Sequence, residues 1–211
     1  MFAGASLDEN SGAFCELKAN FFRLILTKAE FCGLTVHDIN FDEHTFSVNN
    51  QLQRTREGEY IIVPTKTSAG KRVLPMTKEV EEHFRNIIKE REKPRIEPMI
   101  DGKSGFLYLD KNGNPSVGLH WAHYFKHICQ KYNSIYKVQM PTVTPHICRH
   151  TYCSNMARSG ISAKTLQYLM GHSDISVTLN VYTHLGLEDA QQELKQLEKR
   201  ANSQTSKVVN F

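Results

Sequence analysis

The sequence predicts a mixed α+β fold that is mainly α-helical and carries a small antiparallel β-sheet near its N-terminal side. Four short segments with alternating or β-branched residues lie between residues 35 and 74. Helical periodicity dominates most of the remaining chain. Apolar residues form 40% and charged residues 23% of the 211 positions, which is the balance of a globular domain with a core.

The predicted sheet follows an N-terminal helix. That helix is expected over residues 16–33, because apolar residues recur at helical spacing and Gly33 suits a C-cap. The expected strands are separated by polar turns and occupy residues 35–41, 45–50, 59–63 and 72–74. Residues 64–71 form the turn between the last two strands, so Lys66 is predicted to lie on a hairpin rather than in the core.

Further helices are predicted after the sheet, at residues 78–92, 119–136, 162–170 and 187–199. Another helix is expected to begin at Pro145, with Thr144 as its N-cap. The short apolar piece at residues 105–109 is either a loop or an edge strand. One domain over residues 16–200 is therefore expected, with an atypical lead-in at residues 1–15 and a flexible tail at residues 201–211.

Charge is distributed unevenly along the chain. The formal charge is only +4, from 26 Lys and Arg against 22 Asp and Glu, and by itself it distinguishes no function. Between residues 115 and 186, however, six Lys and Arg and seven of the ten histidines accompany a single acid, Asp174. This part of the chain is predicted to bind an anion, although a basic surface without a partner remains the alternative.

The sequence argues against a membrane or secreted protein. A membrane span needs about 18–20 successive apolar residues, and the most apolar stretch is interrupted by Arg23. The first residues have neither the basic nor the apolar region of a secretory signal. The five cysteines are an odd number without a Cys-x-x-Cys pair, so free thiols and a cytoplasmic location are expected.

Three short motifs carry candidate chemistry. The run His146-Ile147-Cys148-Arg149-His150 begins a predicted helix, so that His146 and Arg149 share a face next to the amides that favour an anion. Gly171-His172 follows, and Tyr182 comes ten residues after His172. Each motif alone is weak, because a lone histidine or tyrosine is more often structural, but the ordered set is specific.

These residue types would allow a phosphodiester to be broken without a metal ion. Tyr182 supplies a nucleophile, although its phenol, with a pKa of about 10, needs a neighbouring base or cation. Arg149 offers a planar fork to two phosphoryl oxygens. His146 and His172 are able to donate hydrogen bonds to those oxygens, and Lys66 is able to protonate the leaving oxygen.

In this order the motifs resemble the tyrosine recombinases, or phage-type integrases, and in particular the integrases of conjugative transposons. The resemblance covers about residues 26–190 and includes residues 30–35 and 65–67. It implies the tyrosine recombinase catalytic-domain fold and a 3′-phosphotyrosine intermediate in the integration or excision of a mobile element. It also implies a homo-tetramer on double-stranded DNA in a bacterial cytoplasm, associated with the nucleoid, and neither a cofactor nor a metal. The implied catalytic residues are Lys66, His146, Arg149, His172 and Tyr182.

One catalytic position departs from the family pattern. The segment from Ile25 to Glu30 places Thr27 where the family carries a further arginine, and either Lys28 or Arg23 is a candidate substitute. Loss of such a phosphate clamp costs on the order of 100-fold or more in rate. Too few residues precede the match for the upstream DNA-clamping domain of the family. A truncated or decayed integrase that binds DNA without full catalysis is therefore the alternative function.

Two other interpretations compete with a recombinase. A metal site would use the crowded group His146, Cys148, His150 and Cys153, although its spacing matches zinc sites poorly. A type IB topoisomerase would use the same chemistry to relax supercoils, and a plasmid relaxation assay separates it from a recombinase.

Overall fold

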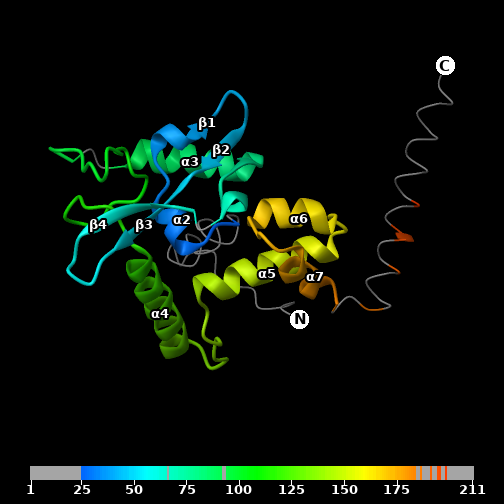
Figure 1. Cartoon of the computed structure of the whole chain (residues 1–211). Coiled ribbons are helices and arrows are strands. Elements are labelled where there is room, and N and C mark those ends of the chain that lie inside the picture. Colours follow the sequence, from blue (N-terminus) through cyan, green and yellow to red (C-terminus); the bar gives the residue numbers. More distant parts are fainter. Residues whose placement is uncertain are drawn as a thin grey trace, which may run out of the picture.

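The structure is a computed structural model that describes residues 25–183 apart from 66, 92 and 93, together with Gly186 and four residues between 191 and 198. Strands and short helices of the N-terminal half lie on one side of the molecule, and a group of helices lies on the other (Figure 1). The α-helices are α2 (Lys28–Cys32), α3 (Lys78–Glu90), α4 (Gly118–Ile135), α5 (Pro145–Arg158), α6 (Ala163–Met170) and α7 (Ile175–Tyr182). The strands are β1 (Ile39–Asn40), β2 (Thr45–Val48), β3 (Asn50–Arg54), β4 (Tyr60–Pro64) and β5 (Arg72–Pro75).

The strands form two antiparallel sheets, which corrects the prediction of a single sheet. One sheet has the order β1-β2-β5, and the other pairs β3 with β4. The predicted strand over residues 45–50 divides at residue 49, because β2 pairs with β5 as far as Val48 whereas β3 begins a new ladder at Asn50 opposite Pro64. The segment between β4 and β5 therefore connects two sheets, so the predicted hairpin between these strands is wrong. This segment contains a short 3-10 helix, Ser68–Gly70.

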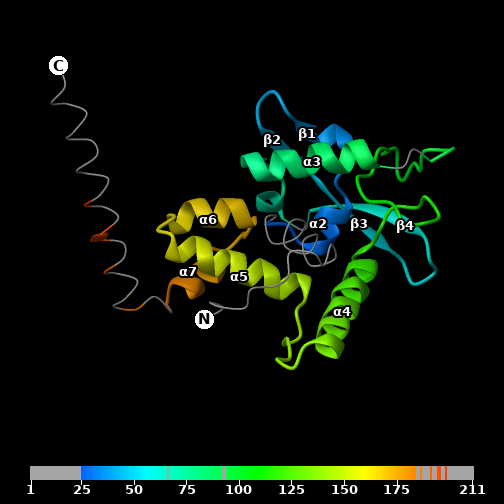
Figure 2. The same ribbon diagram turned by 180° about the vertical axis from the view of Figure 1, so that it is seen from behind.

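The main core extends from the three-stranded sheet and α3 to α2, β3 and α4. Val80 and Phe84 on α3 are buried, and the Phe84 ring meets Phe46 of β2 edge to face at 5.4 Å. The views from the front and from behind place α3 on one face of this sheet (Figure 2). Phe106 and Leu107 are buried in the same core, so the apolar piece at residues 105–109 is a loop, which forms isolated bridges from Phe106 to Thr35 and from Leu109 to Pro115.

A second apolar cluster joins α5, α6 and α7. Its buried members are Ile25, Cys153, Ala157, Leu166 and Met170. Helix α7 was missed by the sequence analysis because β-branched residues such as Ile175 and Val177 weaken its helical propensity. Packing against α5 and α6 compensates for this, and the Asp174 side chain caps the first turn by accepting from the amide of Ser176.

Within its described part, the predicted helix over residues 16–33 is wrong at residues 25–27 and right from Lys28 onward. Residues 25–27 are not helical, and α2 begins only at Lys28. Thr27 has an extended backbone and is the N-cap, so it does not share a helical face with Arg23, which lies outside the described residues. The predicted end is confirmed, because Gly33 is the C-cap of α2.

The helices predicted at residues 78–92, 119–136 and 162–170 are confirmed, with ends that differ by up to two residues. Helix α5 begins as predicted, with Thr144 as N-cap and Pro145 in its first turn. In the helix expected over residues 187–199, only Gln191, Leu194, Lys195 and Glu198 lie within the described residues, and they are helical. The lead-in at 1–15 and the tail at 201–211 lie outside the described residues. None of the described helices is long and apolar enough to span a membrane.

Candidate active site

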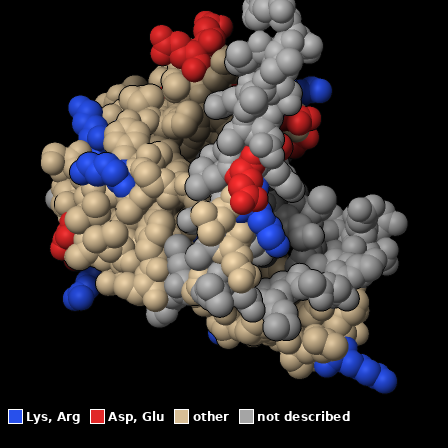
Figure 3. All heavy atoms as spheres, turned by 90° about the vertical axis from the view of Figure 1, so that its right-hand side faces the viewer, with Lys and Arg blue, Asp and Glu red and all other residues tan. Residues whose placement is uncertain are grey.

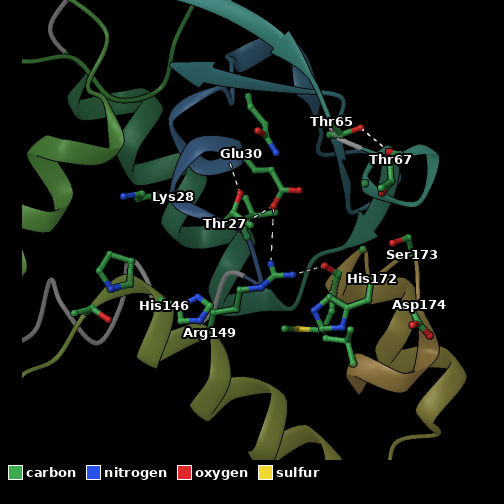
Figure 4. Close-up of a pocket in the computed structure, with 18 of the residues that line it drawn as sticks. Thr27, Lys28, Glu30, Thr65, Thr67, His146, Arg149, His172, Ser173 and Asp174 are labelled. Atoms are coloured by element: carbon green, nitrogen blue, oxygen red, sulfur yellow. Dashed lines mark hydrogen bonds and ion pairs between the residues drawn. The ribbon is translucent and has the colours of Figure 1, made fainter. Parts of the chain in front are cut away.

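A cavity of about 640 Å³ opens where the two halves of the molecule meet (Figure 4). Its walls come from α2, the β4–β5 connection, the N-terminus of α5 and the turn after α6. The polar residues that line it include Thr27, Lys28, Glu30, Gln51, Thr65, Thr67, Thr144, His146, Arg149, His172, Ser173 and Asp174. Segments more than 100 residues apart in the sequence therefore meet around one space.

The N-terminus of α5 forms the floor of this cavity. The Thr144 hydroxyl accepts a hydrogen bond of 3.2 Å from the amide of Ile147, and Pro145 has no amide hydrogen to satisfy. His146 and Arg149 are one helical turn apart, and both line the cavity as predicted. No acid lies in this first turn, so the helix dipole and both side chains favour a bound anion.

Arg149 is held at the back of the cavity by two backbone carbonyls. Its Nη1 donates to the oxygen of Ile25 and its Nη2 to the oxygen of Met170. The Glu30 carboxylate lies 3.9 Å away, and the Arg149 side chain is 11% exposed. Burial lowers the pKa of Arg149 and the charge of Glu30 opposes that shift. A guanidinium stays protonated at neutral pH, so the cavity contains a fixed cation.

Glu30 lines the cavity and pairs with the buried Arg72, and neither residue was predicted from the sequence as part of the site. Arg72 is fully buried and donates to the Glu30 carboxylate at 3.0 Å. A sequence signal for Arg72 was present in β5, where side chains alternate between the two faces and Arg72 lies on the same buried side as Leu74. A charged residue in phase with a core position indicates a buried ion pair, because an unpaired buried charge is very unfavourable.

His172 enters the cavity from the turn after α6. Gly171 ends α6 with φ +67°, a left-handed conformation that lets the chain turn sharply. The ring Nδ1 of His172 lies 3.0 Å from the hydroxyl of Thr178 on α7. Burial lowers the pKa of His172, and the positive charges of Arg149 and Arg72 lower it further. The ring is therefore mainly neutral at pH 7 and donates through one nitrogen.

His146 also contacts a second histidine of the same helix. The Nε2 atoms of His146 and His150 are 2.8 Å apart, and the two rings are nearly perpendicular. One nitrogen must donate and the other accept, so the pair shares one proton at this contact. Burial and the neighbouring His146 lower the pKa of His150.

The four side chains of the competing metal hypothesis do not converge. His146 and His150 are exposed, whereas Cys148 and Cys153 are buried. Within the described ranges, no three His, Cys, Asp or Glu side chains lie close enough to hold a metal ion. Burial raises the pKa of Cys148 to about 11, which disfavours the thiolate that a metal requires.

Tyr182 does not line the cavity. It ends α7, is half-buried, and donates a hydrogen bond of 2.6 Å from its hydroxyl to the carbonyl of Ile161. Lys66 lies outside the described residues, but its neighbours Thr65 and Thr67 line the cavity. The structure thus brings together His146, Arg149 and His172, and it holds the Tyr182 hydroxyl elsewhere.

Thr27 and Lys28 occupy the wall opposite α5. The Thr27 hydroxyl accepts from the amide of Glu30, whose carboxylate in turn accepts from the amide of Thr27 at 2.8 Å. The stem of Lys28 packs on Gly118, where an added Cβ would lie 2.9 Å from Cδ of Lys28. Lys28 therefore extends toward the start of α4 and points away from Arg149 (Figure 4). Thr27 itself adds no positive charge to the cavity.

The sequence and the fold both match a known family. The family model described as "Phage integrase family" matches residues 22–189, and the chain belongs to this family. The transposase from transposon Tn916 of Enterococcus faecalis is 38% identical over 172 residues, which are 81% of this chain and 42% of that protein. The integrase of Staphylococcus phage L54a is 30% identical over 174 residues, 81% of this chain and 47% of that protein.

Comparison of the fold with solved structures supports the same family. The Tn1549 transposon integrase, solved in complex with circular intermediate DNA, is 37% identical with a TM-score of 0.76 over 90% of this chain and 60% of that chain. The XerA recombinase shares the fold at 19% identity, with a TM-score of 0.56 over 87% of this chain and 56% of that chain. The predicted fold class, a tyrosine recombinase catalytic domain, is confirmed. The chain spans about two fifths to three fifths of the length of these relatives.

Proposed function

We propose that this chain is the catalytic part of a site-specific recombinase that cleaves and rejoins DNA in the integration or excision of a mobile element. The convergence of His146, Arg149 and His172 on one cavity at the start of a helix carries this proposal. The cavity offers one fixed cation, helix amides and two imidazoles to a phosphate. Membership of the phage integrase family supports the same chemistry.

The proposed reaction transfers a phosphoryl group between two oxygens. The Tyr182 hydroxyl passes its proton to one of the two imidazoles, His146 or His172, as its oxygen attacks the phosphorus; a 3′-phosphotyrosine forms and the bond to the 5′ oxygen breaks. Lys66 delivers a proton to that 5′ oxygen, which leaves as a hydroxyl group. Arg149, His146 and His172 bind the non-bridging oxygens as charge builds up on them. The reverse reaction rejoins the strands, because the phosphodiester energy is retained in the tyrosyl linkage.

This reaction requires Tyr182 to leave the position in which the structure holds it. Its hydroxyl must leave the carbonyl of Ile161 and move into the cavity, which breaks one hydrogen bond. A neutral hydrogen bond of this kind is worth about 1 kcal/mol, so DNA binding easily compensates for the change. The observed arrangement is therefore proposed as the resting state of the nucleophile.

Double-stranded DNA is the proposed partner. Helices α4 and α5 contain no Asp or Glu, and α4 exposes Lys126 and Lys131. On the face that includes α6, the Lys and Arg side chains stand apart and Asp and Glu side chains lie among them (Figure 3). The DNA surface is therefore assigned to α4 and the N-terminus of α5. A homo-tetramer on DNA and a nucleoid-associated, cytoplasmic location complete the proposal.

The alternative function is DNA binding without full catalysis. The position of Thr27 favours it, because its hydroxyl caps α2 and the neighbouring Lys28 points away from Arg149. Among the described residues that line the cavity, Arg149 is then the one arginine for the phosphate. Loss of one fixed donor of this kind slows related reactions by about 100-fold or more.

A trapping experiment separates the two functions. The purified chain is incubated with a pool of nicked duplexes whose central sequence is randomised, so that cleavage near the nick releases a short strand and traps the adduct. Recombinase activity predicts adducts that survive denaturation, that leave a 5′-hydroxyl end, and that Tyr182→Phe abolishes. Enrichment of one sequence without an adduct supports DNA binding alone. Relaxation of a supercoiled plasmid without strand exchange would instead indicate a topoisomerase.

A further inference from the structure

We propose that Arg72 is a positioning residue that holds three walls of the cavity in place and orients Arg149 through a shared carboxylate. This inference rests on the proposed function, because it concerns the same cavity. Arg72 lies in β5 and its side chain is fully buried, so it is not itself available to DNA. Its effect on a bound phosphate must therefore pass through the groups that it contacts.

Arg72 joins three segments that are distant in the sequence. Its Nη1 donates to the carbonyl of Gly70 at 2.8 Å and to the Glu30 carboxylate at 3.0 Å. Its Nε donates to the carbonyl of Leu169 at 3.0 Å. These partners belong to the β4–β5 connection, to α2 and to the C-terminal end of α6 respectively. Each of the three segments supplies lining residues of the cavity.

The two arginines bind the same end of α6. Arg72 donates to the carbonyl of Leu169, and Arg149 donates to the next carbonyl, that of Met170. Both also face Glu30, whose carboxylate oxygens lie 3.0 Å from Arg72 and 3.9 Å from Arg149. A displacement of α6 or Glu30 would therefore move Arg149, and with it the cation that faces the phosphate.

The backbone at Gly171 is fitted closely around Arg72. A Cβ at this position would lie 2.7 Å from Nη1 of Arg72 and 3.2 Å from the carbonyl oxygen of Ala69. The residue after Gly171 is His172, so the contact also sets where that ring enters the cavity. A guanidinium has a planar set of donors with fixed directions, and a lysine ammonium is unable to bind these three partners together.

The test compares Arg72→Lys and Arg72→Met with a control that weakens the core elsewhere. Val80→Ala serves as the control, because Val80 is buried on α3 and does not line the cavity. All variants are assayed well below their melting temperatures on a nicked duplex recovered from the trapping experiment. Two quantities are measured, the dissociation constant for DNA and the first-order rate of adduct formation at saturating DNA.

For Arg72→Lys we expect a rate about 100-fold below that of the unchanged protein, since a displacement of about 1 Å has effects of that size. The DNA dissociation constant should stay within a few-fold, because the phosphate contacts outside the cavity are unchanged. A purely structural residue would lower the melting temperature and leave this rate as it is in Val80→Ala. A rate within twofold of that control overturns the proposal.

If the unchanged chain forms no adduct, the proposed catalysis is contradicted but the proposal about Arg72 is not. A second measurement then tests the role of Arg72. Amide hydrogen exchange is then followed in Arg72→Met and Val80→Ala without DNA. The proposal predicts faster exchange in Arg72→Met at residues 67–71 and 169–172, beyond any change in Val80→Ala. Equal exchange of these two segments in both variants overturns it.

Discussion

The hydroxyl of Tyr182 donates a hydrogen bond of 2.6 Å to the backbone carbonyl of Ile161, so the candidate nucleophile is engaged with the turn before α6. Tyr182→Phe is expected to lower the free energy of unfolding by about 1 kcal/mol, because the Ile161 carbonyl loses its donor. Urea unfolding measures this change. Tyr152→Phe is the matched control, since Tyr152 packs against the same cluster and donates no hydrogen bond to any residue that the structure describes. Equal destabilisation by both substitutions would contradict the prediction.

The burial of His172 predicts a loss of stability in acid. Burial and two nearby arginines lower the pKa of His172, so the unfolded chain binds the proton more readily than the folded chain. The free energy of unfolding should therefore fall as the pH decreases below the ordinary histidine value of about 6.5. In His172→Gln this dependence should weaken, as measured by urea unfolding at several pH values between 5 and 8. The exposed residue His123 on α4 provides the control His123→Gln, which should retain the dependence.

The two carbonyl contacts of Arg149 predict that lysine is a poor substitute. Arg149→Lys is expected to slow adduct formation by about 100-fold or more, because a single ammonium does not replace the fork that binds Ile25 and Met170. The rate at saturating DNA is the measurement, with DNA affinity determined in parallel. A decrease confined to the affinity would show that Arg149 acts in binding and not in the reaction.

The cap at Thr27 predicts that replacing this residue by arginine lowers the stability of the fold and raises the rate of adduct formation. Thr27→Arg removes the hydroxyl that caps α2 and should lower the free energy of unfolding by about 1 kcal/mol. It also places a second guanidinium at the wall of the cavity, and adduct formation should rise by at least about tenfold. Thr27→Ala is the matched control, since it loses the cap and adds no cation. An equal rate in both variants would show that this position does not face the phosphate.

The absence of Asp and Glu from α4 predicts salt-dependent DNA binding. Lys126→Ala and Lys131→Ala should each weaken binding and reduce the slope of log affinity against log salt by about 1 unit. Titrations at several salt concentrations measure the slope. Lys89→Ala removes an exposed lysine from α3 and should leave the slope unchanged. A reduction as large in Lys89→Ala would move the DNA surface away from α4.

Local sequence signals predicted the elements whose ends are set by neighbouring residues. Helix α5 begins where Thr144 and Pro145 indicate, and α2 ends at Gly33, because caps and breakers act within a few residues. The same logic placed His146 and Arg149 on one face. Helix α7 was not predicted, because its stability comes from packing against α5 and α6 and not from the helical propensity of its own residues.

The sequence by itself determined the family, the order of the motifs and the two cavity residues at the start of α5. Only the tertiary structure showed that one stretch divides between two sheets, that Glu30 and Arg72 pair inside the cavity wall, and that Tyr182 bonds to Ile161. The physical reason is the range of the interactions. Periodicity and caps depend on residues a few positions apart, whereas strand pairing, buried ion pairs and the position of a side chain depend on segments that meet only after folding.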